Sequence, residues 1–320
     1  MLKTRRGRIV SVGTCVPETI MTNADFEKIL DTSDEWITTR TGIRQRHIAK
    51  NAGDCNTAEM GCAAARIALD RAGITADRID GVICATITPD SFYPSTACRI
   101  QGLLGCRRIM AFDCAAACAG FIYGLTLANN CIAAGQGETY LIVGSETMSR
   151  SIDWTDRSTA ILFGDGAGAV VMRATDEPDS GLLSTILESD GTLAEILNFP
   201  AWTETRVMTM KGNEVFRHAV RIMSDLLVRA VANAGLALDN IDYIIPHQAN
   251  IRIIRAIGEN LKLPAEKVIV NLDRYGNSSS ASIPLALGDL QAAGKLKKDT
   301  TLAFTALGGG LAMGSAVVRL

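Results

Sequence analysis

Three residues of types that catalyse acyl transfer follow apolar, strand-like segments of the sequence. Cys118 lies in the stretch FDCAAACAGF, His247 follows the segment IDYIIP, and Asn277 lies in DRYGNSSSAS. A thiol can act as nucleophile and leaving group, and an imidazole and a carboxamide can donate hydrogen bonds to a developing negative charge. Functional sites of α/β sheets form beyond the C-terminal ends of strands. We therefore expect the three side chains to come together at one site.

Each of these residues also has an ordinary structural explanation when it is taken alone. A cysteine among alanines is commonly a small core residue, a histidine after a strand commonly bonds to its own loop, and Asn-Ser-Ser is typical of turns. The glycine-rich segments GDGAGA (164–169) and GGG (308–310) do not form a GxGxxG motif between a strand and a helix. The joint position of the three residues, and not any one of them, favours catalysis.

The surroundings of Cys118 indicate a reactive thiol and no metal. This cysteine opens an expected helix, and a helix N-terminus lowers the pKa of a thiol. Cys114 lies four residues earlier, but the chain has only three histidines and no CxxC pair. Because a zinc site needs further ligands at suitable spacing, we expect none here.

The composition excludes several classes of protein. The chain has 320 residues with a net charge of −2, which gives no support for binding to nucleic acid or to a membrane surface. Its nine cysteines show no repeated spacing, so we expect reduced thiols in a cytoplasmic protein. The basic N-terminus leads directly into a strand-like segment and does not resemble a signal peptide.

A run without charged residues extends from Cys114 to Gly137. Its length would allow a transmembrane helix. Its glycines, its alanines and the pair Asn129-Asn130 instead favour a helix buried inside a large domain.

An internal repeat defines the organisation of the chain. Three pairs of segments recur in the same order, which indicates two copies of one unit, at 1–175 and 176–320. The pairs are AGITADRIDGVI from Ala72 with AGLALDNIDYII from Ala234, RIMAFD ending at Asp113 with VIVNLD ending at Asp273, and GAGAVVMR ending at Arg173 with MGSAVVRL ending at Leu320.

Strand and helix patterns alternate in each copy, which predicts an α/β fold with largely parallel sheets. Two such sheets would enclose a shared layer of small, uncharged helices, and the loop of Asn277 would be the counterpart of the loop of Cys118. In the first copy we expect strands near 7–13, 80–86, 108–113, 139–145 and 161–172, and helices near 57–71, 94–103 and 118–134.

Seven motifs run in order along nearly the whole chain: TSDEWITTRTGI (32–43), AAACAGF (115–121), FGDGAGA (163–169), GNEVF (212–216), HQAN (247–250), DRYGNSS (273–279) and GGG (308–310). In these motifs the sequence resembles the β-ketoacyl-acyl-carrier-protein synthase III family of thiolase-like condensing enzymes. The resemblance implies a five-layer α-β-α-β-α sandwich of two duplicated halves, which agrees with the internal repeat.

The resemblance also implies a reaction. An acyl group from acyl-CoA is loaded on Cys118, and malonyl carried on acyl carrier protein then loses CO2 and attacks the acyl-cysteine. His247 and Asn277 stabilise the enolate, and the backbone N–H groups of Cys118 and Gly309 form the oxyanion hole. Elongating relatives use two histidines, so the Cys-His-Asn set indicates the initiating class. Coenzyme A enters as part of a substrate, and the reaction requires no separate cofactor.

Further positions are carried over from the family motifs. The residues implied to bind coenzyme A are Thr32, Trp36, Arg40, Arg157, Asn213 and Asn250, with Trp36 and Arg157 on either side of the adenine. The residues implied to bind the acidic carrier protein are Gln248, Ala249, Asn250, Ile251, Arg252, Arg217, Arg221 and Arg255. The acyl pocket is implied to include Tyr93, Phe163 and Leu307, with Tyr93 reaching the partner subunit of a homodimer.

Two alternatives to this function stay open at the level of sequence. Tyr93 and Leu307 stand where many relatives have Phe, which would change the acyl group that the pocket prefers. Specialised condensing enzymes and acyltransferases of secondary metabolism use the same three catalytic residues, so this is the first alternative. A non-catalytic interaction subunit is the second alternative, and it would not be acylated on Cys118.

Overall fold

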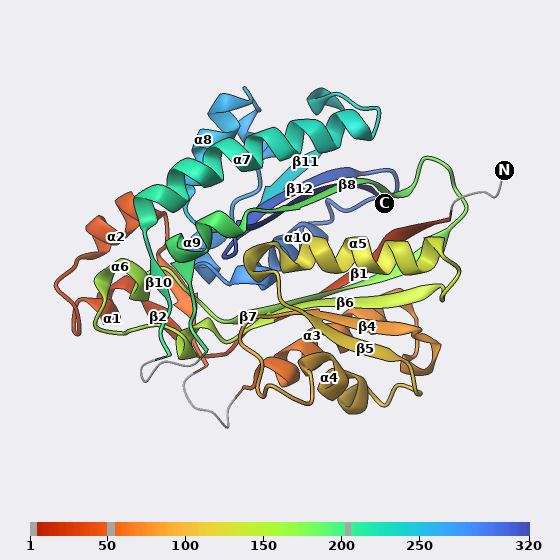
Figure 1. Ribbon diagram of the computed structural model, residues 1–320, viewed down its shortest axis with the longest axis horizontal. Coiled ribbons are helices and arrows are strands. Elements are labelled where there is room, and N and C mark those ends of the chain that lie inside the picture. Colours follow the sequence, from red (N-terminus) through yellow and green to blue (C-terminus); the bar gives the residue numbers. More distant parts are fainter. Residues whose placement is uncertain (1–4, 50–54, 202–205) are drawn as a thin grey trace.

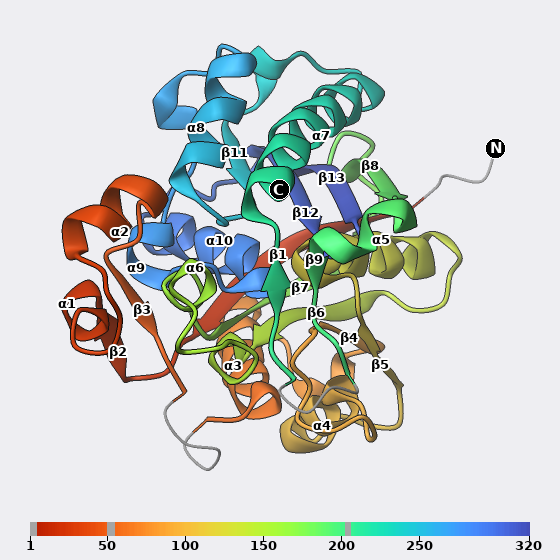
Figure 2. The same cartoon turned by 60° about the vertical axis from the view of Figure 1, so that its left-hand side comes forward.

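Two large β-sheets frame the protein, with helices between them and on both outer faces (Figures 1 and 2). The computed structural model describes residues 5–49, 55–201 and 206–320. Helices α5 and α10 lie between the sheets, α3 and α4 cover the first sheet, and α7 covers the second with α8 packed beside it. The predicted α/β sandwich of five layers is confirmed.

The two sheets share one topology. The first has the order β1-β7-β6-β4-β5, and the second has the order β8-β13-β12-β11 when it is traced from its β8 edge. In the first sheet, β6 pairs with β7 in antiparallel and with β4 in parallel orientation. In the second sheet, β12 pairs in the same way with β13 and with β11. The strands are β1 (Arg6–Cys15), β4 (Gly81–Ala85), β5 (Met110–Cys114), β6 (Thr139–Glu146), β7 (Gly166–Thr175), β8 (Gly181–Ser189), β11 (Tyr243–Pro246), β12 (Thr301–Gly308) and β13 (Ala312–Arg319).

The helices follow the same duplication. The principal ones are α3 (Thr57–Ala72), α4 (Thr96–Leu104), α5 (Gly120–Ala133), α7 (Gly212–Asn233), α8 (Ile251–Asn260) and α10 (Ser282–Ala292). Shorter elements are α1 (Asn23–Phe26), α2 (Asp34–Thr41), α6 (Arg157–Ala160), α9 (Leu272–Tyr275), the strand pairs β2 (Ile20–Thr22) with β3 (Gln45–His47) and β9 (Leu197–Asn198) with β10 (Thr209–Met210), and the 3-10 turns η1 (Ala76–Arg78), η2 (Ala117–Ala119), η3 (Met148–Arg150), η4 (Gly191–Ile196), η5 (Leu238–Asn240), η6 (Ala265–Lys267) and η7 (Ser279–Ala281).

Helix α5 explains the uncharged run of the sequence. Its side chains Phe121, Ile122 and Leu125 are fully buried between the sheets. A Cβ at Gly124 would lie 2.9 Å from the side chain of Ile142, so the helix approaches β6 closely. The end of the run, from residue 133 to 136, is exposed, so the expected burial holds for its first part only. No helix in the described part of the chain is long and apolar enough to span a membrane.

Two expected strands differ from the structure. The segment predicted at 161–172 becomes a strand only at Gly166, because α6 and its following turn occupy the residues before it. The segment VIVNLD contributes a single bridge, between Val268 and Ile244, and its end belongs to α9. Gln248 explains this second difference, since its side chain bonds to the backbone of Ile269 and Asn271 and ties the segment to the loop after β11.

Candidate active site

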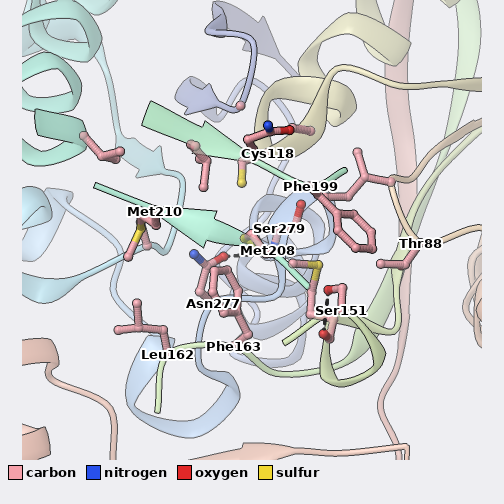
Figure 3. Close-up of a pocket in the computed structure, with 18 of the residues that line it drawn as sticks. Thr88, Cys118, Ser151, Leu162, Phe163, Phe199, Met208, Met210, Asn277 and Ser279 are labelled. Atoms are coloured by element: carbon pink, nitrogen blue, oxygen red, sulfur yellow. Dashed lines mark hydrogen bonds between the residues drawn. The ribbon is translucent and has the colours of Figure 1, made fainter. Parts of the chain in front are cut away.

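Cys118 lies in a sharp turn between β5 and α5. The preceding residue Ala117 has a φ of 46°, in the left-handed region that few non-glycine residues adopt. The turn packs directly on the end of β12, where a Cβ at Gly308 would lie only 2.5 Å from the backbone nitrogen of Cys118. The sulfur of Cys118 points into a cavity (Figure 3). The backbone therefore presents the thiol at a fixed position beyond a strand end.

His247 is oriented by a backbone hydrogen bond to β12 and by a contact with the first residue of α10. Its backbone N–H donates to the carbonyl of Thr305 (2.8 Å), and its Nδ1 lies 2.8 Å from Oγ of Ser282, the first residue of α10. The Ser282 hydroxyl also accepts from the backbone N–H of Gln248 (3.5 Å). If this hydroxyl donates to Nδ1, the proton of the neutral ring is on Nε2. Burial lowers the pKa of His247 to about 3, which keeps the imidazole neutral at pH 7.

Asn277 has a carboxamide with its oxygen engaged and its nitrogen free. Its Oδ1 accepts from the backbone N–H of Ser279 (3.0 Å), and its own backbone N–H donates to the carbonyl of Leu162 (2.8 Å). Among the described residues, Nδ2 has no hydrogen-bond partner. Asn277 and Cys118 border the same cavity, and Phe163 lies beside Asn277 (Figure 3). A neutral N–H donor is therefore available opposite the thiol.

A cavity of about 1370 Å³ joins these groups to the surface. The structure brings together most of the residues predicted from sequence. The predicted residues that line the cavity are Trp36, Arg40, Tyr93, Cys118, Phe163, Asn213, His247, Ala249, Asn250, Arg252, Asn277, Leu307 and Gly309. Those that lie outside its lining are Thr32, Arg157, Arg217, Arg221, Gln248, Ile251 and Arg255.

The expectation of a lowered thiol pKa differs from the structure. Burial raises the pKa of Cys118 to about 12, and the charge of Glu146 adds to the rise. The Ser279 hydroxyl and the backbone act in the opposite direction, but their effect is smaller. Desolvation of the thiolate exceeds the effect of the helix N-terminus, because only 8% of Cys118 is exposed.

Trp36 and Arg40 line the cavity, and Arg157 lies against Trp36 outside that lining. The guanidinium groups of Arg40 and Arg157 lie 4.6 and 4.5 Å from the centre of the Trp36 ring. Arg157 also donates to the carbonyl of Asp31 (2.6 Å). An adenine between Trp36 and Arg157 would therefore have to displace the guanidinium from the ring. Thr32 has a buried hydroxyl without a partner among the described residues, next to this cluster in sequence.

The segment from Gln248 to Arg252 combines internal and exposed residues. Gln248 is buried and its side chain is fully engaged with backbone groups, so it does not reach a docking partner. Asn250 caps α8 by accepting from the backbone N–H of Arg252 (2.8 Å). Ile251 packs against the end of α2 at Gly42. The exposed positions begin with Arg252.

Four arginines form a basic surface on α7 and α8. Arg217 and Arg221 are exposed on α7, and Arg252 and Arg255 are exposed on α8. The two helices pack against each other, and Arg252 lines the cavity. The role of these arginines in docking stays a prediction.

Sequence reasoning missed most of the cavity wall near Cys118. The missed residues are Thr86, Ile87, Thr88, Ser151, Phe199 and Met208, and several of them are drawn in Figure 3. Thr86 directly follows β4, so the rule that sites form at strand ends would have found it. Phe199 and Met208 flank β9 and β10, and no local signal distinguishes them from ordinary core residues.

The duplicated five-layer fold, with a buried Cys, His and Asn at one cavity between its halves, defines the class of thiolase-like condensing enzymes. Residues 112–191 match the family profile of 3-oxoacyl-acyl-carrier-protein synthase III, and residues 231–320 match the profile of its C-terminal part. The chain is 45% identical to β-ketoacyl-acyl-carrier-protein synthase III of Xanthomonas campestris pv. campestris, over 100% of both chains.

Solved structures agree with this classification. The crystal structure of 3-oxoacyl-acyl-carrier-protein synthase III from Aquifex aeolicus VF5 has a TM-score of 0.94 and 44% identity, with 98% of this chain and 100% of that chain covered. The priming β-ketosynthase of the R1128 polyketide pathway has a TM-score of 0.94 and 35% identity, covering 99% and 97% of the two chains. The chain belongs to the β-ketoacyl-acyl-carrier-protein synthase III family.

Proposed function

We propose that this chain condenses an acyl-CoA starter with malonyl-acyl carrier protein and thereby initiates fatty acid synthesis. The observation that carries the proposal is the meeting of Cys118, His247 and Asn277 at one cavity, with neutral N–H donors on the last two. Membership of the family supports the same reaction. The names of its relatives supply the substrate classes.

In the first half-reaction the Cys118 sulfur attacks the thioester carbonyl of acyl-CoA. A new S–C bond forms, the S–C bond to coenzyme A breaks, and the departing sulfur takes up the proton that the cysteine loses. The backbone N–H groups of Cys118 and Gly309 stabilise the tetrahedral oxyanion. Because burial favours the neutral thiol, we expect loss of its proton to accompany substrate binding and attack.

In the second half-reaction the C–CO2 bond of the malonyl group breaks, and its electron pair passes to the thioester as an enolate. Nε2–H of His247 and Nδ2–H of Asn277 donate to the enolate oxygen without adding a buried charge. The carbanion attacks the acyl carbonyl, the bond from that carbon to the Cys118 sulfur breaks, and the released thiolate takes up a proton from solvent. Departure of CO2 drives formation of the C–C bond.

The remaining assignments follow the shape and charge of the cavity. We propose that coenzyme A enters past Thr32, Trp36, Arg40 and Arg157, and that Asn213 and Asn250 contact its pantetheine arm. The carrier protein is acidic, so the basic surface of Arg217, Arg221, Arg252 and Arg255 is its proposed docking site.

We also propose 1–175 and 176–320 as the two units of the chain, since the strands of the two large sheets fall on either side of residue 176. A cytoplasmic location stays a prediction.

The proposed assembly is a homodimer through β5. This strand is the free edge of the first sheet, and Phe92, Tyr93, Leu103 and Met110 near it are 70%, 88%, 47% and 39% exposed. Two copies related by a twofold axis could pair these edges and cover the apolar side chains. Light scattering should give twice the mass of the chain at micromolar concentration, whereas a stable monomer would exclude this assembly.

Intact-protein mass spectrometry after mixing with acetyl-, isobutyryl- and octanoyl-CoA tests the proposed function. We expect one acyl group on Cys118, followed by CO2 release when malonyl-carrier protein is added. A chain that takes up no acyl group would be the non-catalytic alternative. The likeness to a polyketide priming synthase keeps a specialised condensing enzyme as the second candidate, and preference for an acceptor other than the fatty acid carrier protein would identify it.

A further inference from the structure

Glu146 is a buried carboxyl group that the proposed mechanism does not use. It is the last residue of β6, its side chain is fully buried, and no salt bridge among the described residues includes it. A buried carboxylate without an ion pair is costly unless hydrogen bonds replace the water that would solvate its charge. Its protonation state must therefore follow from its hydrogen bonds.

One oxygen of Glu146 collects the donors from the loop after β4. Oε2 accepts from the hydroxyls of Thr86 (3.1 Å) and Thr88 (2.6 Å) and from the backbone N–H groups of Ile87 (3.0 Å) and Thr88 (3.1 Å). Thr86, Ile87 and Thr88 all line the cavity that holds Cys118. Oε2 thus fixes part of the cavity wall.

The other oxygen has one well-formed hydrogen bond among the described residues, and its partner lies in the second half of the chain. Oε1 is 2.9 Å from Oγ of Ser280, and the same Oγ is 2.8 Å from the carbonyl oxygen of Ala85. A serine hydroxyl carries one proton, and a carbonyl can only accept. If Ser280 donates to Ala85, the hydrogen bond between Ser280 and Glu146 requires a proton on Oε1.

We infer that Glu146 is held as a neutral carboxylic acid that donates to Ser280, and that it is a positioning residue that joins the cavity wall to the catalytic loop. Ser280 lies between Asn277 and Ser282, the residue that orients His247. The carboxyl group therefore links Thr86–Thr88 of one half to the loop that places both proposed enolate donors. This role in catalysis rests on the proposed function, whereas the protonation state does not.

Neutrality has a consequence for the nucleophile. A charged Glu146 raises the pKa of the Cys118 thiol, and burial raises the pKa of Glu146 itself. The Ser279 hydroxyl lies beside both groups, is buried, and has no well-formed hydrogen bond among the described residues. With Glu146 neutral, this hydroxyl can turn towards a thiolate or enolate without competition from a second negative charge.

Asp165 provides a matched contrast within the same chain. Its two oxygens accept from the backbone N–H groups of Ala49 (2.6 Å) and Ser149 (2.8 Å) and from the Ser149 hydroxyl (2.6 Å). All of these partners donate, so among the described residues this buried carboxyl group has no acceptor that would need its proton. The same reasoning that makes Glu146 neutral leaves Asp165 ionised.

Amide substitutions separate the two cases. Glu146→Gln keeps an acceptor towards Thr86–Thr88 and gains an NH2 donor towards Ser280, so its unfolding midpoint should stay close to that of the unmodified chain. Asp165→Asn places an NH2 group against the N–H groups of Ala49 and Ser149, which are also donors. This variant should therefore have a lower unfolding midpoint. Infrared difference spectra should show one band of a protonated carboxyl group, sensitive to D2O, that disappears in Glu146→Gln. Absence of this band, or equal destabilisation by both amides, would overturn the assignment of charge.

The positioning role is tested by activity. Glu146→Ala should lower acyl loading and CO2 release by about tenfold or more, because several buried donors lose their acceptor. Glu146→Gln should restore both to within about threefold, less than the effect of one hydrogen bond. If Gln is as damaging as Ala, the positioning role is wrong. If the unmodified chain takes up no acyl group, the proposed function fails, while the infrared and unfolding results still decide the state of Glu146.

Discussion

The turn before α5 and the turn before α10 have the same backbone and different chemistry. Ala117 has a φ of 46° and Ser279, 162 positions later, has a φ of 49°. Each begins a 3-10 turn of three residues that runs directly into a central helix. Cys118 and Ser280 are therefore equivalent residues of the two halves.

The strand ends that face these turns also differ. Gly308 and Glu146 are the last residues of β12 and β6, again 162 positions apart. The bare backbone of Gly308 lets the Cys118 turn approach closely, whereas Glu146 meets Ser280 with a hydrogen bond. One turn presents its side chain to the cavity, and the other uses its side chain to hold the halves together. The duplication preserves the backbone, and single side chains decide which turn is reactive.

Cys118→Ser would make the two turns chemically alike, and it should have the largest effect. A serine hydroxyl at this position stays protonated at neutral pH, so acyl loading should fall by at least ~10³-fold, as when a catalytic nucleophile is removed. Mass spectrometry after mixing with acyl-CoA measures the loss. Cys114→Ser is the matched control and should load normally. Loading of Cys118→Ser at a comparable rate would show that another residue is the nucleophile.

His247→Ala and Asn277→Ala should separate the two half-reactions. Both variants should still acquire the acyl group, because the thiol and the proposed oxyanion hole remain. CO2 release from malonyl-carrier protein should fall by ~10²–10³-fold for each, the usual effect of losing one donor to a developing oxyanion. The two rates must be measured separately. Decarboxylation by Asn277→Ala at the unmodified rate would contradict the role given to its Nδ2 group.

Gly308→Ala tests how closely the turn that carries Cys118 packs against the end of β12. The added methyl group would lie 2.5 Å from the backbone nitrogen of Cys118, so one of the two segments must move. We expect a loss of ~1–3 kcal/mol in the free energy of unfolding, together with slower acyl loading. Gly102→Ala is the control, because no atom lies within 4 Å of its added Cβ. Unchanged stability in Gly308→Ala would mean that the turn is not held against the strand end.

The sequence was sufficient to predict the duplication, because three pairs of similar segments recur in the same order in both halves. It predicted that Cys118, His247 and Asn277 share one site, and all three line one cavity. Asn277 follows α9 and not the expected strand. Local patterns could not predict that the segment before Asp273 would leave the sheet, since that depends on the long-range hydrogen bonds of Gln248. The raised pKa of Cys118 was also beyond sequence reasoning, because it results from the depth of burial and not from the helix that follows.

The buried imidazole of His247 should make the stability of the chain depend on pH. The pKa of His247 is about 3 in the folded chain and near 6.5 when unfolded. The unfolded state therefore binds a proton first as the pH falls, so this contribution to stability is complete above pH 6.5 and is lost progressively between pH 6.5 and 3. At pH 5 the loss should be about 2 kcal/mol. Urea unfolding at pH 7.5 and pH 5, at one protein concentration, should show this extra loss in the unmodified chain and not in His247→Asn, while equal losses in both would show that the imidazole is solvated or already charged.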